Sequence, residues 1–151
     1  MSFPETPGSS FDLLTGQCKR MEIQMPLFKW YKKYSVSNKE LDEHHKTLFD
    51  IFNRLYDNCL AHDKAHCIDP IIDELKAYSS YHFTAEEQHM RTKGYQEIDK
   101  HISAHRGFTQ RTLHLQQVAG KDEPEATREL IAFLGNWLLH HVIEEDKKYT
   151  V

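Results

Sequence analysis

Apolar side chains recur at intervals of three and four residues in four separate stretches of the chain, and this periodicity is the strongest constraint on the fold. Each stretch is about 22 residues long, which corresponds to an α-helix of about 33 Å. Four helices of similar length joined by short loops predict an all-α protein, an up-down-up-down antiparallel four-helix bundle. The stretches run from about Asn38 to Ala61, Pro70 to Lys93, Glu97 to Val118, and Pro124 to Lys147 or Lys148.

Residues that start or end helices occur at the limits of these stretches. Ser37 or Asn38 can cap the first stretch, and Asp69 followed by Pro70 is a favourable start for the second. Gly94 and Gly120 follow the second and third stretches, where glycine commonly ends a helix. The local sequence therefore agrees with the periodicity on where the helices lie.

The chain has 151 residues, enough for one ordinary domain and too few for two. Residues 1–26 contain Pro4, Pro7 and Gly8 and little sustained periodicity, which predicts a flexible leader. We therefore place the four-helix domain in residues 27–151. Its aromatic first segment, Phe28–Tyr34, is expected to form an extended N-terminal arm packed over the core.

Composition argues against several classes of partner. The net charge is 19 − 23 = −4 with histidine neutral, so no basic field indicates nucleic acid or an anionic membrane. No apolar run approaches the ~20 residues of a membrane span, and the N-terminus lacks a secretory apolar core. We expect a cytoplasmic protein. Because no broad apolar stripe is left exposed, we also expect a monomer.

The three cysteines, Cys18, Cys59 and Cys67, show neither CxxC spacing nor an even number for pairing. Cys59 lies at helical spacing from Phe52 and Leu55, which favours a buried free thiol. A disulfide between Cys59 and Cys67 is the alternative, with no support from the sequence.

Histidine is unusually frequent, with 11 residues, and several histidines continue the apolar faces of the helices instead of opposing them. A single histidine in such a stripe is usually a satisfied core residue. Here all four stretches carry at least one, and Glu86 lies four residues after His82 on the same helical face. An acidic residue also lies near the end of the fourth stretch. The inward histidines are His45, His82, His101, His105 and His141.

Burying this many polar groups without partners would cost several kcal/mol for each group, more than a marginally stable domain tolerates. A shared metal cluster satisfies all of them at once. Seven ligands exceed what one tetrahedral zinc uses, so the sequence indicates two metals. Imidazole and carboxylate without thiolate suit non-haem iron. Two bridging carboxylates and five imidazoles leave one coordination position for a small molecule such as dioxygen, and the many neutral imidazoles favour reversible binding over strong oxidation.

Four segments of the chain resemble the hemerythrin family, and in particular its single-domain bacterial members. The likeness extends from about Phe28 to Tyr149 and includes both the order and the spacing of the motifs. The segments are Leu41-Asp42-Glu43-His44-His45-Lys46, His82-Phe83-x-x-Glu86-Glu87, His101-x-x-x-His105-x-x-Phe108 and Trp137-Leu138-x-x-His141-Val142-x-x-x-Asp146.

The resemblance implies two iron ions joined by two carboxylates and an oxo or hydroxo group. It implies that His101, His105 and His141 bind one iron. His45 and His82 would bind the second iron, which is five-coordinate and takes dioxygen. Glu86 and Asp146 would bridge the pair.

Two of these assignments depend on the resemblance. Spacing alone favours Glu145, four residues after His141, whereas the family pattern selects Asp146. The family often has Gln-His where this chain has His44 and His45, and the register selects His45. The other histidines are expected at the surface or the rim of the site: His44, His62, His66, His89, His114 and His140.

The function implied by the resemblance is reversible dioxygen binding without catalytic turnover, for storage, transport or delivery to an oxygen-consuming enzyme. Leu138 and Trp137 are expected to keep the dioxygen pocket apolar, which limits irreversible oxidation of the iron. The alternatives are an oxygen or redox sensor, a di-iron enzyme acting on nitric oxide or peroxide, and a protein for metal storage or iron repair.

Overall fold

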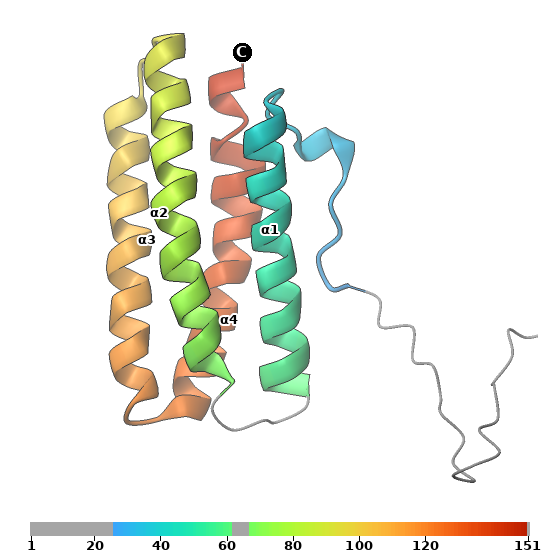
Figure 1. Cartoon of the computed structure of the whole chain (residues 1–151), viewed down its shortest axis with the longest axis vertical. Helices are drawn as coiled ribbons and strands as arrows, with labels where there is room; N and C mark the ends of the chain where they lie inside the picture. Colours follow the sequence, from blue (N-terminus) through green and yellow to red (C-terminus); the bar gives the residue numbers. More distant parts are fainter. Residues whose placement is uncertain (1–25, 62–66, 151) are drawn as a thin grey trace, which may run out of the picture.

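Four long helices run alternately up and down the molecule (Figure 1). The computed structural model describes residues 26–61 and 67–150, so the predicted leader lies outside the described residues except for Pro26. The predicted all-α, up-down-up-down four-helix bundle is confirmed. None of the helices in the described part of the chain is long and apolar enough to cross a membrane. The four helices are α1 (Lys39–Leu55), α2 (Ile68–Lys93), α3 (Ile98–Ala119) and α4 (Glu123–Asn136).

Two of the helices continue as π-helix, in which each hydrogen bond spans five residues instead of four. The segment η2 (Tyr56–Ala61) extends α1, and η3 (Trp137–Glu145) extends α4. The chain then forms a short 3₁₀ turn, η4 (Lys148–Thr150). The fourth predicted helix is therefore continuous in space, but its second half is wound more loosely than the periodicity predicts.

The helix ends follow the predicted signals closely. The side chain of Asn38 caps α1 by accepting from the backbone N–H of Leu41 at 3.1 Å. Gly94 ends α2 with a φ of 65°, a left-handed conformation that glycine adopts without strain. Asp122 caps α4 by accepting from the backbone N–H of Glu125. The start of α2 lies two residues before the predicted Pro70, at Ile68.

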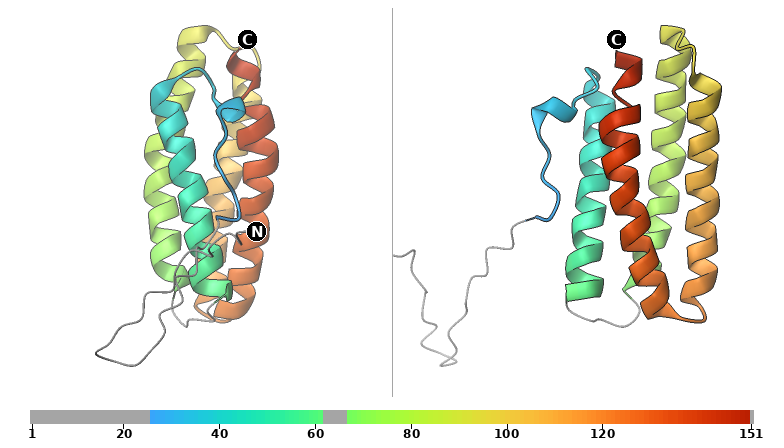
Figure 2. Two further views of the ribbon diagram at one scale, coloured as in Figure 1. Left: turned by 90° about the vertical axis from the view of Figure 1, so that its right-hand side faces the viewer. Right: turned by 180° about the vertical axis from the view of Figure 1, so that it is seen from behind.

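The N-terminal arm packs along the bundle as predicted, beside α1 and α4 (Figure 2). The side chain of Asn53 accepts from the backbone N–H of Phe28 and donates to its carbonyl oxygen, both at 2.9 Å. The Phe28 ring meets the Phe52 ring edge to face, with centroids 4.9 Å apart. Farther along, the carboxylate of Asp42 accepts from the hydroxyl of Ser35 and the backbone N–H of Val36. The arm is thus fixed at both ends to α1.

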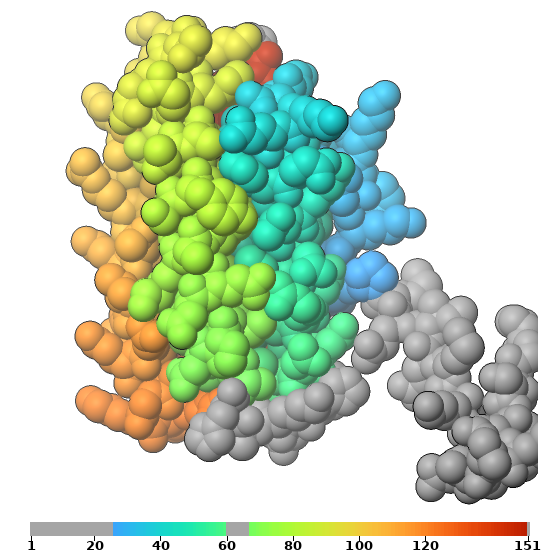
Figure 3. All heavy atoms as spheres, viewed as in Figure 1, coloured from blue at the N-terminus to red at the C-terminus, as the bar shows by residue number. Residues whose placement is uncertain are grey.

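The buried apolar residues form two clusters of different size. The larger cluster begins at the end of the bundle where α1 connects to α2 and fills most of its length. It includes Phe49, Leu75 and Leu138. The smaller consists of Val36, Leu41, Met90 and Tyr149, near the start of α1 and the end of the described chain. On the face seen in Figure 3, the side chains of α1 and α2 meet along the length of both helices. The buried histidines and carboxylates belong to neither cluster.

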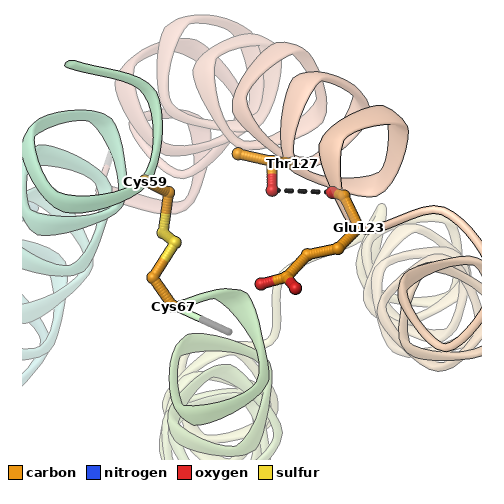
Figure 4. The surroundings of a disulfide bond; sticks show 4 residues. All are labelled: Cys59, Cys67, Glu123 and Thr127. Carbon is orange, nitrogen blue, oxygen red and sulfur yellow. Dashed lines mark hydrogen bonds between the residues drawn. A yellow bond between two sulfur atoms is a disulfide. The ribbon is translucent and has the colours of Figure 1, made fainter. Parts of the chain in front are cut away.

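Cys59 and Cys67 are joined by a disulfide, so the predicted free thiol at Cys59 is wrong (Figure 4). The bond connects the end of η2 to the residue before α2, with the two Cα atoms 5.6 Å apart. Across the bundle, Thr127 of α4 donates its hydroxyl to the carbonyl oxygen of Glu123 at 2.8 Å. The sequence pattern could not indicate the disulfide between Cys59 and Cys67, because that bond depends on how α1 and α2 approach each other in space.

We predict that replacing both bridged cysteines, Cys59→Ala with Cys67→Ala, lowers the free energy of unfolding by about 2–3 kcal/mol, because the closed loop no longer restricts the unfolded chain. Urea unfolding monitored by circular dichroism measures this change. Metal stoichiometry should stay the same, because the bridge lies at the opposite end of the bundle from the inward histidines. Equal stability of the reduced and oxidised wild-type protein would contradict the prediction.

Candidate metal centre

α1, α2, α3 and the π-helical continuation of α4, η3, each contribute a side chain to one buried polar cluster. Residues of this cluster form two groups, and within each group the ligand atoms all lie within 4.8 Å of one another. One group contains Glu86, His101, His105 and His141, and the other contains His45, His82, Glu86 and Asp146. All seven predicted ligands are therefore brought together, and the two groups share Glu86. None of the seven is more than 7% exposed.

The carboxylate of Asp146 belongs to the second group and also reaches histidines of the first. Its Oδ1 is 3.0 Å from Nε2 of His101 and 3.1 Å from Nε2 of His141. Its Oδ2 is 3.1 Å from Nε2 of His45, on the other side of the cluster. One oxygen thus faces each group, as a carboxylate that bridges two metal ions requires.

Glu86 is placed in a similar way from α2. Its Oε2 is 2.9 Å from Nε2 of His105 and 3.3 Å from Nε2 of His101. The Nε2 atoms of His45 and His82 each lie 3.7 Å from one of its oxygens. The carboxylate is completely buried and touches histidines of both groups.

Several of these close polar atoms are not hydrogen-bonded to each other. Nε2 of His45, His105 and His141 and both oxygens of Asp146 have neighbours at about 3 Å but no hydrogen bond. Ligands around one octahedral ion, with bonds of about 2.1 Å, lie about 3 Å from their neighbours and point at the ion instead of at each other. The distances of about 3 Å and the absence of hydrogen bonds between these atoms both fit residues that converge on shared metal ions.

The two buried carboxylates control the protonation of the histidines before any metal binds. Burial alone lowers the pKa of His45, but its contacts with Asp146 and Glu86 raise it to about 9. The same balance raises the pKa of His101 to about 9. For His82, burial dominates and lowers the pKa to about 3. Burial alone raises the pKa of Glu86, but the surrounding histidines hold it well below its usual range, so the carboxylate stays ionised.

The π-helical winding of η3 explains why Asp146, and not Glu145, lies in the cluster. The backbone N–H of Asp146 donates to the carbonyl oxygen of His141, five residues earlier, at 2.9 Å. This bond stacks Asp146 near His141 along the helix axis. Glu145 instead points to the surface, where its carboxylate accepts from Lys148 at 2.7 Å.

Three residues outside the predicted ligand set hold its members in place. The phenol of Tyr149 donates to Oε1 of Glu86 at 2.6 Å, and Nδ1 of His105 lies 2.9 Å from Oε1 of Glu87. Nδ1 of His44 lies 3.3 Å from Nδ1 of His82. The sequence pattern predicts His44 only at the surface or the rim of the site and gives Tyr149 no role in it. The available signal was that a buried tyrosine hydroxyl needs a polar partner.

Aromatic rings stack on three of the histidines and exclude water from them. The ring of Phe83 stacks on His105 with centroids 3.9 Å apart, and Trp137 stacks on His141 at 3.8 Å. Tyr78 stacks on His82 at 5.1 Å. Trp137 therefore borders the group with three histidines. Leu138 is fully buried in the larger apolar cluster, one turn before His141.

The remaining histidines are placed mostly as predicted. His114 and His140 are exposed, and His89 is half-buried with its ring beside the side chain of Asn38. His62 and His66 lie outside the described residues.

Comparison with known proteins identifies the relatives of this chain. A family model described as "Hemerythrin HHE cation binding domain" matches residues 36–150. The bacteriohemerythrin of Clostridium acetobutylicum is 28% identical over 82% of this chain and 98% of its own length. The bacteriohemerythrin of Methylococcus capsulatus is 32% identical over 72% of this chain and 82% of its own. The myohemerythrin of Theromyzon tessulatum is 29% identical over 85% of this chain and 94% of its own.

Solved structures agree with the sequence comparisons. The crystal structure of a hemerythrin point mutant has a TM-score of 0.69 to this chain at 29% identity, covering 83% of this chain and 96% of the other. The family match includes all seven residues of the buried cluster. The chain belongs to the hemerythrin family.

Proposed function

We propose that the cluster binds two iron ions. In this proposal His101, His105 and His141 hold one ion and His45 and His82 hold the other. Glu86 and Asp146 bridge the two, since each carboxylate approaches histidines of both groups. The donor set supports iron, because it combines imidazole with carboxylate and contains no thiolate.

We infer further that the centre binds dioxygen reversibly, for storage, transport or delivery to an oxygen-consuming enzyme, and without turnover. Iron held by these histidines and carboxylates would supply the electrons that dioxygen binding requires. The observation that carries the proposal is the enclosure of a histidine-rich site between two apolar clusters. The relatives named bacteriohemerythrin and myohemerythrin support the same function.

The protein's own residues keep the site rigid and dry in this role. Tyr149 fixes the orientation of Glu86, and Glu87 fixes the ring of His105. Such outer contacts set ring orientation and ligand basicity at metal sites. Trp137 covers one face of the His141 ring, and Leu138 is fully buried one turn earlier, so water has little room to approach that face of the ring.

Reversible oxygenation is the direct test of the proposed function. The protein, loaded anaerobically with ferrous iron, should hold about two ions per chain and develop a visible absorption band in air that fades under vacuum. Direct conversion to a stable ferric spectrum would contradict reversible binding and favour a sensor or an enzyme. Measured turnover of nitric oxide or peroxide would separate the enzyme from the sensor.

The apolar shielding is tested by Leu138→Ala. Shortening this side chain opens space for water beside the centre, so we predict faster spontaneous oxidation of the oxygenated protein, on the order of tenfold. Leu75→Ala is the matched control, because Leu75 is equally buried but lies nearer the disulfide end of the bundle. The decay of the oxygenated absorption band gives the rate. Equal rates in the two variants, both folded and fully loaded, would reject the shielding role.

Metal binding should release protons, because a metal and a proton compete for the same imidazole nitrogen. His45 and His101, each with a pKa of about 9, are protonated at pH 7.5 before metal binds. We predict release of about two protons per chain from these residues and an apparent affinity that rises with pH up to about 9. Calorimetric titration in buffers of different ionisation enthalpy counts the protons. Binding heats that do not depend on the buffer would contradict this prediction.

A further inference from the structure

The centre comes nearest to solvent at two of its seven predicted ligands. His101 is 5% exposed and His141 is 7% exposed, whereas the other five are at most 2% exposed. Both belong to the group with three histidines. Along the bundle axis the centre lies between the two apolar clusters, so an ion in solution must reach it from the side, between helices.

A cavity of about 150 Å³ opens beside these two histidines. It lies between the first half of α3 and the end of η3, close to the turn that joins α2 to α3. Besides the rings of His101 and His141, it is lined by Tyr95, Glu97, Lys100, Ala104 and Glu145. The larger hollows beside Lys33, Lys76 and Lys93 are lined by none of the seven predicted ligands.

We propose that this cavity is the route by which divalent metal ions reach the centre and leave it. The inference rests on the proposed function, since it assigns a path to the metals of that same site. An ion that takes this route meets the group with three histidines first, at His141.

The side chains along the cavity suit the successive steps of capture. Glu97 lies exposed at its margin, where its carboxylate attracts a hydrated cation and the charge of Lys100 opposes that attraction. The carboxylate of Glu145, also in the lining, is already paired with Lys148. Farther in, Nε2 of His141 has no hydrogen bond although its side chain is only 8% exposed. It can therefore accept an arriving ion without first losing a partner. Oδ1 of Asp146, 3.1 Å from the same nitrogen, is the next donor inward.

The protein contains its own reporter for this path. Trp137 stacks on His141 with centroids 3.8 Å apart and ring planes 12° from parallel. The other tryptophan, Trp30, lies near His45 at 6.3 Å. In a Trp30→Phe background, Trp137 is the single tryptophan, and quenching of its fluorescence by Co²⁺ reports the arrival of metal beside His141.

The first test narrows the cavity without changing a ligand. Ala104→Phe places a ring in the cavity, whereas Ser103→Phe places the same ring on the exposed side of the same helix. In stopped-flow mixing of the metal-free full chain with Co²⁺, we expect Ala104→Phe to slow loading on the order of tenfold relative to Ser103→Phe. Release to excess chelator should slow by the same factor, because a narrowed path changes both rates and leaves the equilibrium unchanged.

The second test changes only charge and does not depend on how the new ring packs. Glu97→Gln should slow loading severalfold and Lys100→Gln should accelerate it, and both effects should shrink as salt screens the charges. Glu125→Gln is the control for Glu97→Gln. It removes the same negative charge, but at the start of α4, at the far end of the bundle.

The outcomes separate this inference from the function on which it rests. Full loading of every variant with Co²⁺, at rates that neither Ala104→Phe nor the charge substitutions alter, would overturn the route and leave the metal centre intact. A wild-type chain that fails to bind two ions at equilibrium would instead overturn the centre itself. Opposite changes in rate for Glu97→Gln and Lys100→Gln, with unchanged stoichiometry, would support the route.

Discussion

Two ionised carboxylates buried in an apolar helical bundle are the constraint on which the rest of this structure depends. Glu86 and Asp146 are fully inaccessible to solvent, and an unpaired charge in such a place is strongly destabilising. Helices α1, α2 and α3 and the π-helical segment η3 therefore each supply at least one histidine that faces them. The raised pKa values of His45 and His101 are the direct expression of this compensation. Metal ions bound at the same position would replace the protons as the source of positive charge.

The packing around the cluster follows from the need to keep those charges in fixed positions. Flat aromatic rings lie against the faces of His82, His105 and His141, so the imidazoles cannot rotate away from the carboxylates. Apolar clusters border the polar layer along the bundle axis. Rigidity and dryness thus come from the same contacts.

Most of the fold and the core of the candidate site could be predicted from the sequence, because both are encoded in a period of 3.6 residues. That period positions the four helices and turns five histidines and Glu86 inward. It could not select Asp146 over Glu145, because the π-helical winding of η3 changes the local period. Nor could it reveal the hydrogen bond of Tyr149 to Glu86, or the bond between Cys59 and Cys67, since those depend on the approach of separate segments.

The order of the cluster residues along the chain has a consequence for how the protein is made. His45 comes from the first helix, whereas His141, Asp146 and Tyr149 come from the last part of the described chain. During synthesis, a chain that ends before α4 carries Glu86 and four of the histidines but lacks its second buried carboxylate. The two bound ions proposed above could be enclosed only after the final helix docks. Metal occupancy would therefore mark completed folding.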